Sequence, residues 1–279
     1  MLTDFILYFV GILLLGLVHA LVNNYITKES PTSLYNVTTF LVLVLFALCS
    51  SIFFIAIEYF SVFSDLNIFI IGVVSSAFIM SYWFYIAPIF SLLKTKAQYR
   101  DLLLEEELSK NKYNFKVLLS EKIVTNAFAT GGLPYLKLII IAKNLKEILS
   151  HDELMAVVYH EVGHHKKNHI FKLFCIQVVI NSFYFVAFDY FLNLKLQQPY
   201  ELIGVGLLGA FAGLAFYYIP NKFLYYCEFS ADSFSAAIIG ENILSNALSK
   251  VNIHCQGKLE KGNVNHPPLT LRLENIRNG

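Results

Sequence analysis

The sequence predicts a mostly α-helical membrane protein in which several spanning helices surround a small α+β module. Hydrophobic residues make up 56% of the 279 positions and charged residues only 15%, whereas about a quarter of the residues in soluble domains are charged. The apolar residues are concentrated in runs close to the ~20 residues that cross a bilayer. Residues 1–93 contain a single Lys or Arg, Lys28, whereas residues 94–169 contain twelve. This composition excludes disordered and fibrous proteins and argues against an ordinary soluble domain.

Five apolar runs have the length of membrane spans. They cover residues 5–22, 37–57, 66–93, 170–192 and 202–219. Lys and Arg are enriched on the cytoplasmic side of membranes, and here basic residues follow the third run, precede the fourth and follow the fifth. We therefore expect an integral, multi-pass membrane protein with its N-terminus outside and its C-terminus in the cytoplasm.

This orientation divides the chain into four predicted regions. They are an N-terminal region of three spans (1–93), a cytoplasmic module (94–169), two further spans (170–219) and a second cytoplasmic segment (220–279).

The cytoplasmic module is predicted to combine helices with two short strands. Residues 94–112 are polar and favour a helix, whereas residues 115–120 and 135–142 are short apolar runs that favour strands. Between the strands, the Gly and Pro residues of segment 131–134 indicate a turn.

The next helix carries two candidate metal ligands. A capping box formed by Ser150 and Glu153 predicts where this helix begins. Its sequence HEVGH places His160 and His164 four residues apart, about 40° from the same helix face, so that both imidazoles can reach one tetrahedral ion. Glu161 lies beside His160, where it can contact a water at the metal without being a ligand. This is the H-E-x-x-H pattern of zinc metalloproteases.

A third ligand is expected because catalytic zinc sites have three protein ligands and one open position. Glu228, in the sequence CEFSADSF, is the best candidate. It lies on the same predicted side of the membrane, and the small residues around it allow its helix to approach HEVGH. Asp232, one turn later, would hold the other nitrogen of a ligand histidine and fix its tautomer. We therefore expect one Zn²⁺ per chain.

These motifs resemble those of the HtpX type of integral-membrane zinc metalloproteases, which are related to the CAAX prenyl endopeptidases. The resemblance covers about residues 90–279 and preserves the order of four motifs. They are NAFATGG at 126–132, HEVGH at 160–164, EFSAD at 228–232 and HPPLTLR at 266–272. The resemblance implies a zincin-type (gluzincin) catalytic module in which Glu161 is the catalytic base and His160, His164 and Glu228 bind zinc.

The resemblance also implies roles for residues outside the zinc ligands. Asp232 would orient a ligand histidine. His266 would support catalysis or contribute to an oxyanion site, and Arg272 would support the site from behind. The substrate would lie along an edge strand formed by four residues, Asn126, Ala127, Phe128 and Ala129.

A second pair of histidines, His165 and His169, is also spaced by four residues. No Glu follows His165, and Lys166 and Lys167 are its neighbours. This pattern favours a basic face at the membrane interface over a second metal site.

The function that these features predict is a membrane-embedded zinc endopeptidase. It would hydrolyse membrane-associated or unfolded proteins at the cytoplasmic face of a bacterial inner membrane, in protein quality control. Two alternatives stay open: a protease that processes one membrane-associated or secreted peptide, and a catalytically silent zinc-binding scaffold. The expected partners are a protein or peptide substrate and the lipid bilayer, with no nucleic acid, and the sequence leaves the oligomeric state open.

Overall fold

The computed structural model describes the C-terminal two thirds of the chain almost continuously. The described residues are 68–81, 99–121, 123, 125–131, 137–194, 197, 199–263 and 266–278, together with Ile6, Val10 and Val44. The predicted spans 5–22 and 37–57 lie almost wholly outside these residues. The predicted turn at 131–134 also lies outside them, except for Gly131.

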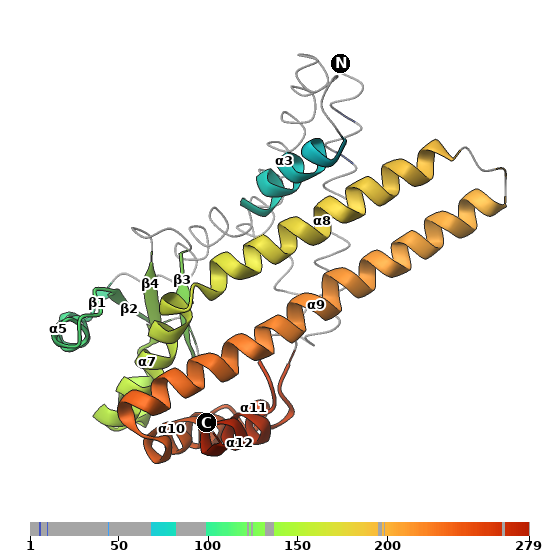
Figure 1. Cartoon of the computed structure of the whole chain (residues 1–279). Helices are drawn as coiled ribbons and strands as arrows, with labels where there is room; N and C mark the ends of the chain where they lie inside the picture. Colours follow the sequence, from blue (N-terminus) through green and yellow to red (C-terminus); the bar gives the residue numbers. More distant parts are fainter. Residues whose placement is uncertain are drawn as a thin grey trace.

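A small sheet of four strands forms one layer of the described structure (Figure 1). The strands are β1 (Tyr99–Arg100), β2 (Lys116–Ser120), β3 (Ala127–Thr130) and β4 (Leu138–Ala142). Their order across the sheet is β1-β2-β4-β3, in which β2 and β4 are parallel and the other neighbours are antiparallel. β3 therefore lies at one edge of the sheet.

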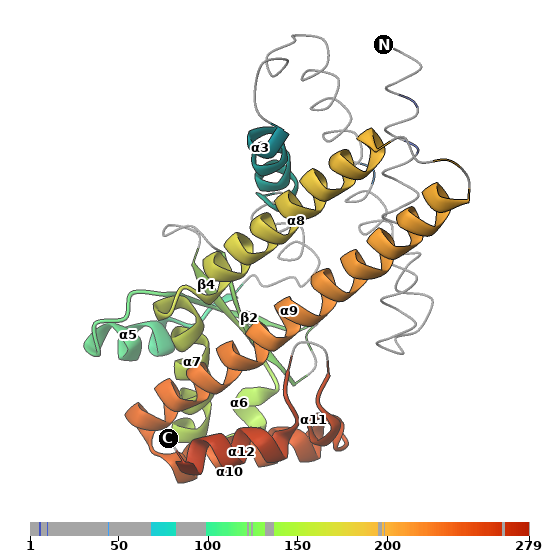
Figure 2. The same cartoon turned by 45° about the vertical axis from the view of Figure 1, so that its right-hand side comes forward.

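Helices cover the sheet and extend away from it. The helices are α3 (Ile68–Ser81), α5 (Leu102–Lys110), α6 (Leu145–Ile148), α7 (His151–Lys166), α8 (His169–Asn193), α9 (Tyr200–Ile239), α10 (Glu241–His254), α11 (Lys258–Lys261) and α12 (Leu269–Asn278). α8 and α9 form a long hairpin that extends away from the sheet, and α3 packs against α8. The last three helices gather at the opposite end of α9, next to α7 (Figure 2).

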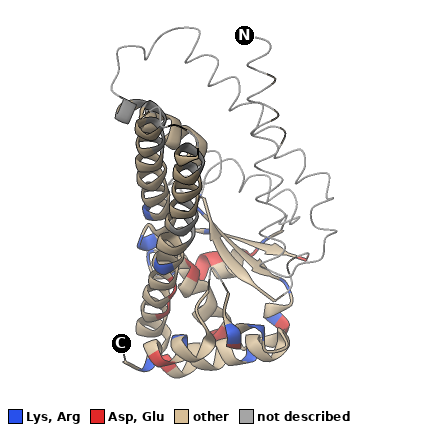
Figure 3. Cartoon of the chain, turned by 90° about the vertical axis from the view of Figure 1, so that its right-hand side faces the viewer, with Lys and Arg blue, Asp and Glu red and all other residues tan. Residues whose placement is uncertain are grey.

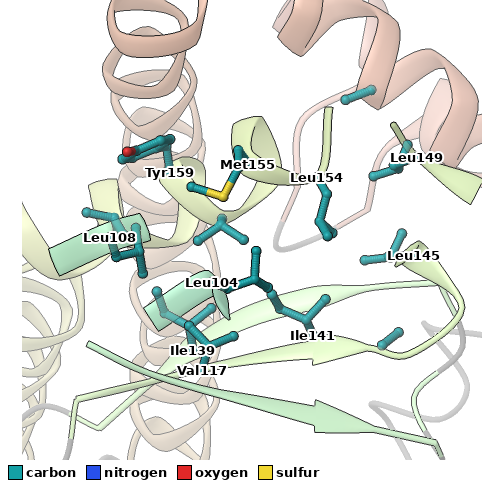
Figure 4. Close-up of a cluster of buried hydrophobic side chains, with 14 residues drawn as sticks. Leu104, Leu108, Val117, Ile139, Ile141, Leu145, Leu149, Leu154, Met155 and Tyr159 are labelled. Carbon is teal, nitrogen blue, oxygen red and sulfur yellow. The ribbon is translucent and has the colours of Figure 1, made fainter. Parts of the chain in front are cut away.

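The main core lies between the sheet, α5 and α7 (Figure 4). Val117, Ile139 and Ile141 extend from the strands toward Leu108 of α5 and Met155 of α7, and all five side chains are fully or almost fully buried. Burial of side chains of this size stabilises a fold by about 1.5–3 kcal/mol each. This core therefore fixes α7, the helix that contains HEVGH, relative to the sheet.

The start of α7 confirms the predicted capping box. The Glu153 amide donates to the Ser150 hydroxyl at 3.4 Å, and the Ser150 amide donates to the Glu153 carboxylate at 2.8 Å. Lys250 Nζ of α10 lies 2.7 Å from the same carboxylate. Burial opposes ionisation of Glu153, but its hydrogen bonds with Lys250 and Ser150 outweigh this effect and hold its pKa below the ordinary value.

The predicted strands 115–120 and 135–142 are confirmed as β2 and β4. The prediction of one helix over residues 94–112 was too long at its N-terminal end. α5 begins only after Asp101, whose carboxylate accepts a hydrogen bond from the Leu104 amide and caps the helix. The two residues before Asp101 pair with β2 as the short strand β1.

The structure joins two regions that the sequence had separated at residue 219. α9 continues without interruption from Tyr200 to Ile239, with Pro220 inside it. The fourth predicted run lies in α8 and the fifth in α9. Among the residues that the structure describes, no helix has a sufficiently long and apolar stretch to qualify as a membrane-crossing helix.

Candidate metal centre

Three side chains form a group with the geometry of a metal site. The Nε2 atoms of His160 and His164 lie 3.1 Å apart, and the Glu228 carboxylate oxygens lie 3.6 Å and 3.3 Å from them. Three ligands about 2.0–2.1 Å from a tetrahedral ion are separated by about 3.3 Å. The three side chains could therefore hold one small ion, and His160, His164 and Glu228 are called the metal-binding group below.

Close packing of α7 against α9 brings Glu228 to the two histidines. A Cβ atom at Gly163 would lie only 3.1 Å from Ala231 Cα and 3.2 Å from the Phe234 ring. The absence of a side chain at Gly163 and the small side chain of Ala231 therefore let the two helices approach. Ser235 Oγ fixes the same contact by donating to the Ala156 carbonyl at 2.6 Å.

Asp232 and Arg272 contact the metal-binding group without belonging to it. His160 Nδ1 is 2.9 Å from an Asp232 carboxylate oxygen. Arg272 of α12 holds both oxygens of Asp232, at 2.8 Å through Nε and 2.6 Å through Nη2. Its Nη1 lies 3.5 Å from Glu228 Oε2. The structure thus brings together both residues that the resemblance had placed near the site.

The electrostatics of this cluster favour ionised carboxylates. Burial opposes ionisation of Glu228, but His164, His266 and Arg272 outweigh it and hold its pKa well below the ordinary value. Burial likewise opposes charge on Asp232, and Arg272 reverses the effect, so that its pKa is also lowered. Although Glu228 Oε2 is buried, it has no hydrogen-bond partner of regular geometry among the described residues. An ionised, incompletely satisfied carboxylate fits a metal ligand.

A cleft of about 400 Å³ lies beside the metal-binding group. Glu161 is buried and lines this cleft, as does His266. His266 Nδ1 is 3.0 Å from Glu228 Oε2, and its side chain is 40% exposed. Apolar side chains also line the cleft, mainly Leu145, Val157, Leu244, Leu248, Val251 and Leu259.

The edge strand β3 borders the same cleft. The Asn126 carbonyl accepts a hydrogen bond from the Ala142 amide, and Ala127 is opposite Ile141 in the antiparallel register. Successive residues of a strand direct their backbone groups to opposite sides. The N–H and C=O groups of Phe128 therefore point toward β4, whereas those of Ala127 and Ala129 point to the other side, where no described strand pairs with β3.

The predicted basic face at His165 and His169 was wrong, because both side chains are buried. His165 stacks on Phe115, and its Nε2 lies 3.0 Å from the Leu138 carbonyl oxygen. His169 Nδ1 lies 3.0 Å from Nδ1 of the metal-binding residue His164. Burial lowers the pKa of His165 to about 4 and that of His169 to about 3. A spacing of four residues had placed the two histidines on one helix, but a turn at Asn168 separates them.

Comparison with known proteins places these motifs in a family. The model of peptidase family M48 matches residues 92–279, which include the HEVGH helix, Glu228 and the HPPLTLR segment. The chain belongs to peptidase family M48. The predicted HtpX-type resemblance is thereby confirmed.

Curated M48 relatives include the protease HtpX of Histophilus somni. It is 31% identical over 179 residues, which cover 55% of this chain and 62% of the relative. The protease HtpX of Glaesserella parasuis is 29% identical over 181 residues, with 55% and 63% coverage. This chain thus spans about three fifths of the length of these relatives. A crystal structure of S. mikatae Ste24p has a similar fold, with a TM-score of 0.59 and 20% identity over 83% of this chain and 63% of that one.

Proposed function

We propose that this M48 protein is a zinc endopeptidase that cleaves flexible protein segments. The observation that carries the proposal is the convergence of His160, His164 and Glu228 beside the buried Glu161, in a cleft that borders an open strand edge. Two imidazoles and one carboxylate, with space for water and substrate, form a donor set typical of catalytic zinc.

Each residue of the centre has a defined task in this proposal. When bound, Zn²⁺ supplies Lewis acidity, which lowers the pKa of water and polarises the scissile carbonyl. Glu161 accepts the proton of the attacking water and later delivers it to the leaving amine. Asp232 keeps His160 in the tautomer that presents Nε2, and Arg272 holds Asp232 in place. His266, which lines the cleft, would donate to the oxygen of the scissile carbonyl.

The substrate backbone would add to the sheet at β3. The outward N–H and C=O groups of Ala129 and the outward C=O of Ala127 can pair with an extended peptide. The Asn126 side chain already accepts from the Ala127 amide at 2.9 Å. Strand addition requires an extended segment, so unfolded or flexible chains are the expected substrates. The apolar wall of the cleft favours a hydrophobic side chain near the scissile bond.

We also propose that the α8–α9 hairpin contacts the lipid bilayer. Phe183 of α8 and Leu207 and Phe211 of α9 are each about two thirds exposed, at 65%, 67% and 65%. Neither helix contains Lys or Arg in its outer part, over residues 173–193 and 200–221. Figure 3 shows that their basic residues gather near the end that joins the sheet module. Extended exposed apolar surfaces of this kind are typical of membrane contacts.

This arrangement supports the proposed placement of the metal centre at the cytoplasmic surface of the membrane. Lys167 directly follows α7, the helix of HEVGH, and Lys222 lies six residues before Glu228 on α9, so basic residues lie close to the metal-binding group. The division into spans 1–93 and 170–219 and cytoplasmic segments 94–169 and 220–279 belongs to the same proposal. Membrane proteins with flexible cytoplasmic segments would then be natural substrates, and quality control of such proteins is the proposed role.

The test of the proposed function is Glu161→Gln in the full-length protein. We expect this variant to retain zinc, since Glu161 is not a ligand, and to lose at least about 100-fold of its turnover of an unstructured model protein, in line with loss of a general base. Glu241→Gln, an exposed substitution at the start of α10, is the matched control and should cleave normally. Undiminished cleavage by Glu161→Gln would remove the mechanism. Zinc binding by the parent without any cleavage would favour the silent scaffold.

The range of substrates separates quality control from processing of one peptide. Membrane proteomes of cells that contain the parent or Glu161→Gln provide the comparison. Quality control predicts that many unrelated membrane proteins accumulate with the inactive variant. Accumulation of one precursor alone would instead support the processing protease.

A further inference from the structure

His169 lies directly against a proposed zinc ligand without belonging to the metal-binding group. Its Nδ1 is 3.0 Å from Nδ1 of His164, and the two rings meet nearly edge to face, at an angle of 79°. We propose that His169 is a positioning residue, which accepts a hydrogen bond from His164 Nδ1 and thereby fixes the tautomer and the orientation of this ligand. The inference rests on the proposed zinc site and extends it.

The turn between α7 and α8 places His169 in this position. On a continuous α-helix, residues five apart point about 140° away from one another and do not meet. Here α7 ends at Lys166, and Asn168 adopts a left-handed conformation with φ of 53°. Lys137 stabilises the turn because its Nζ donates to the His165 carbonyl at 3.1 Å and to the Asn168 side chain at 3.0 Å. The turn therefore changes the orientation of the first residues of α8 relative to α7 and brings His169 next to His164.

The orientation of His164 determines the direction of the hydrogen bond. Its Nε2 faces His160 Nε2 and Glu228, so Nε2 is the nitrogen available to the metal. A neutral imidazole that offers Nε2 as a ligand carries its proton on Nδ1. Nδ1 of His164 must therefore donate, and Nδ1 of His169 accepts while its own proton resides on Nε2. His160 has Asp232 in the corresponding place, at 2.9 Å from its Nδ1.

Simple packing does not explain a histidine at this position. The side chain of His169 is 4% exposed, and its Nε2 has no hydrogen-bond partner among the described residues. A buried polar atom without a partner costs about 1–3 kcal/mol. An apolar ring of similar volume would fill the same space without that cost. The contact with His164 is the favourable interaction that an apolar ring would lack.

Two substitutions separate hydrogen bonding from packing. His169→Phe keeps the ring volume and removes the acceptor, whereas His169→Asn loses volume but retains an oxygen where Nδ1 now lies. Loss of the partner of a metal-binding histidine typically weakens metal affinity or activity by about 10–100-fold. We expect this loss of Zn²⁺ affinity in His169→Phe and a smaller loss in His169→Asn. If packing volume determined Zn²⁺ affinity instead, His169→Asn would bind Zn²⁺ more weakly than His169→Phe.

The measurement is Zn²⁺ affinity of the purified full-length protein, determined by competition with a chelator. The visible absorption spectrum of Co²⁺-loaded protein reports the ligand geometry, and it should change in His169→Phe and be restored in His169→Asn. His169→Leu, which also lacks an acceptor, provides a second comparison should His169→Phe not fold. Parent-like Zn²⁺ affinity in His169→Phe and His169→Leu, or weaker Zn²⁺ affinity in His169→Asn than in His169→Phe, overturns the inference and leaves the proposed function intact. If the parent itself does not bind Zn²⁺, both fail together.

Discussion

Ser235 donates a buried hydrogen bond of 2.6 Å to the backbone carbonyl of Ala156, one helical turn before His160. This contact joins α9 to α7 between residues 79 positions apart. Glu228 lies two turns before Ser235 on the same helix, so the bond fixes the register in which the carboxylate meets the histidines. The geometry of the metal centre therefore depends on a contact that does not itself touch the metal-binding group.

Ser235→Ala should lower the free energy of unfolding by about 1 kcal/mol, the usual net value of such a hydrogen bond. It should also weaken Zn²⁺ binding, because α9 loses a restraint on its register. Ser249→Ala is the matched control, since the Ser249 hydroxyl donates within its own helix, to the Ser245 carbonyl at 2.8 Å. Denaturant unfolding with and without chelator measures both effects. Equal losses of stability and of Zn²⁺ binding in Ser235→Ala and Ser249→Ala would contradict the assigned role of Ser235.

Gly163→Val should separate α7 from α9. Even a Cβ at this position would lie 3.1 Å from the Ala231 backbone, and overpacking of this kind typically costs about 1–3 kcal/mol. We expect lower stability together with reduced Zn²⁺ affinity. Gly209→Val provides the control, because a Cβ there meets no described atom within 4 Å. Metal content and thermal unfolding are the readouts, and a Gly163→Val protein that binds zinc like the parent would contradict the close approach.

Glu153→Gln tests the electrostatic contribution at the start of α7. Glutamine preserves the capping box but not the charge that attracts Lys250, 2.7 Å away. Because the pKa of Glu153 is lowered in the folded protein, its stabilisation is present above the ordinary value of 4.5 and is lost as the pH falls through the folded value. The parent should therefore be more stable than the variant at neutral pH, and the difference should vanish in acid. Unfolding measured across a pH series checks this; a difference that grows toward low pH would contradict it.

Ala129→Pro should impair substrate binding while preserving the sheet. The Ala129 amide points away from β4, and proline is tolerated on edge strands where the lost N–H is not part of the ladder. Loss of one hydrogen bond to the substrate corresponds to a decrease in kcat/KM of about 5–10-fold. Ala129→Gly keeps the amide and serves as the control. Kinetics with an unstructured substrate and a check of thermal stability would show whether β3 receives the substrate; unchanged kcat/KM in a folded Pro variant would argue that it does not.

The parts of the fold that could be predicted are those encoded by local patterns. The capping box of Ser150 and Glu153, the HEVGH helix and the two apolar strands depend on residues close together in sequence. Glu228 could be proposed as a ligand because a zinc site requires a third donor and because small residues surround this glutamate. The position of Arg272 came only from the resemblance to a family, since its contact with Asp232 spans 40 positions.

The features that could not be predicted depend on tertiary packing. Proline normally interrupts a helix, yet Pro220 lies inside α9, which contacts α7, α10 and α12 over its C-terminal part. His169 was placed on an exposed basic face because a spacing of four residues assumes one continuous helix. The left-handed conformation of Asn168 interrupts the helical periodicity, and the spacing of apolar residues in the sequence does not predict this turn.

α9 connects the outer part of the hairpin to the metal centre within one continuous helix. At 1.5 Å per residue, about 30 Å of helix separates Leu207, on the exposed outer part of the hairpin, from Glu228 at the metal centre. No loop interrupts α9 between these two residues, but Pro220 lies between them and lacks the N–H of a regular helical hydrogen bond. Under the proposed bilayer contact, a change in membrane thickness that tilts the outer part of α9 would change the position of Glu228, and Pro220 would be the point at which the helix bends.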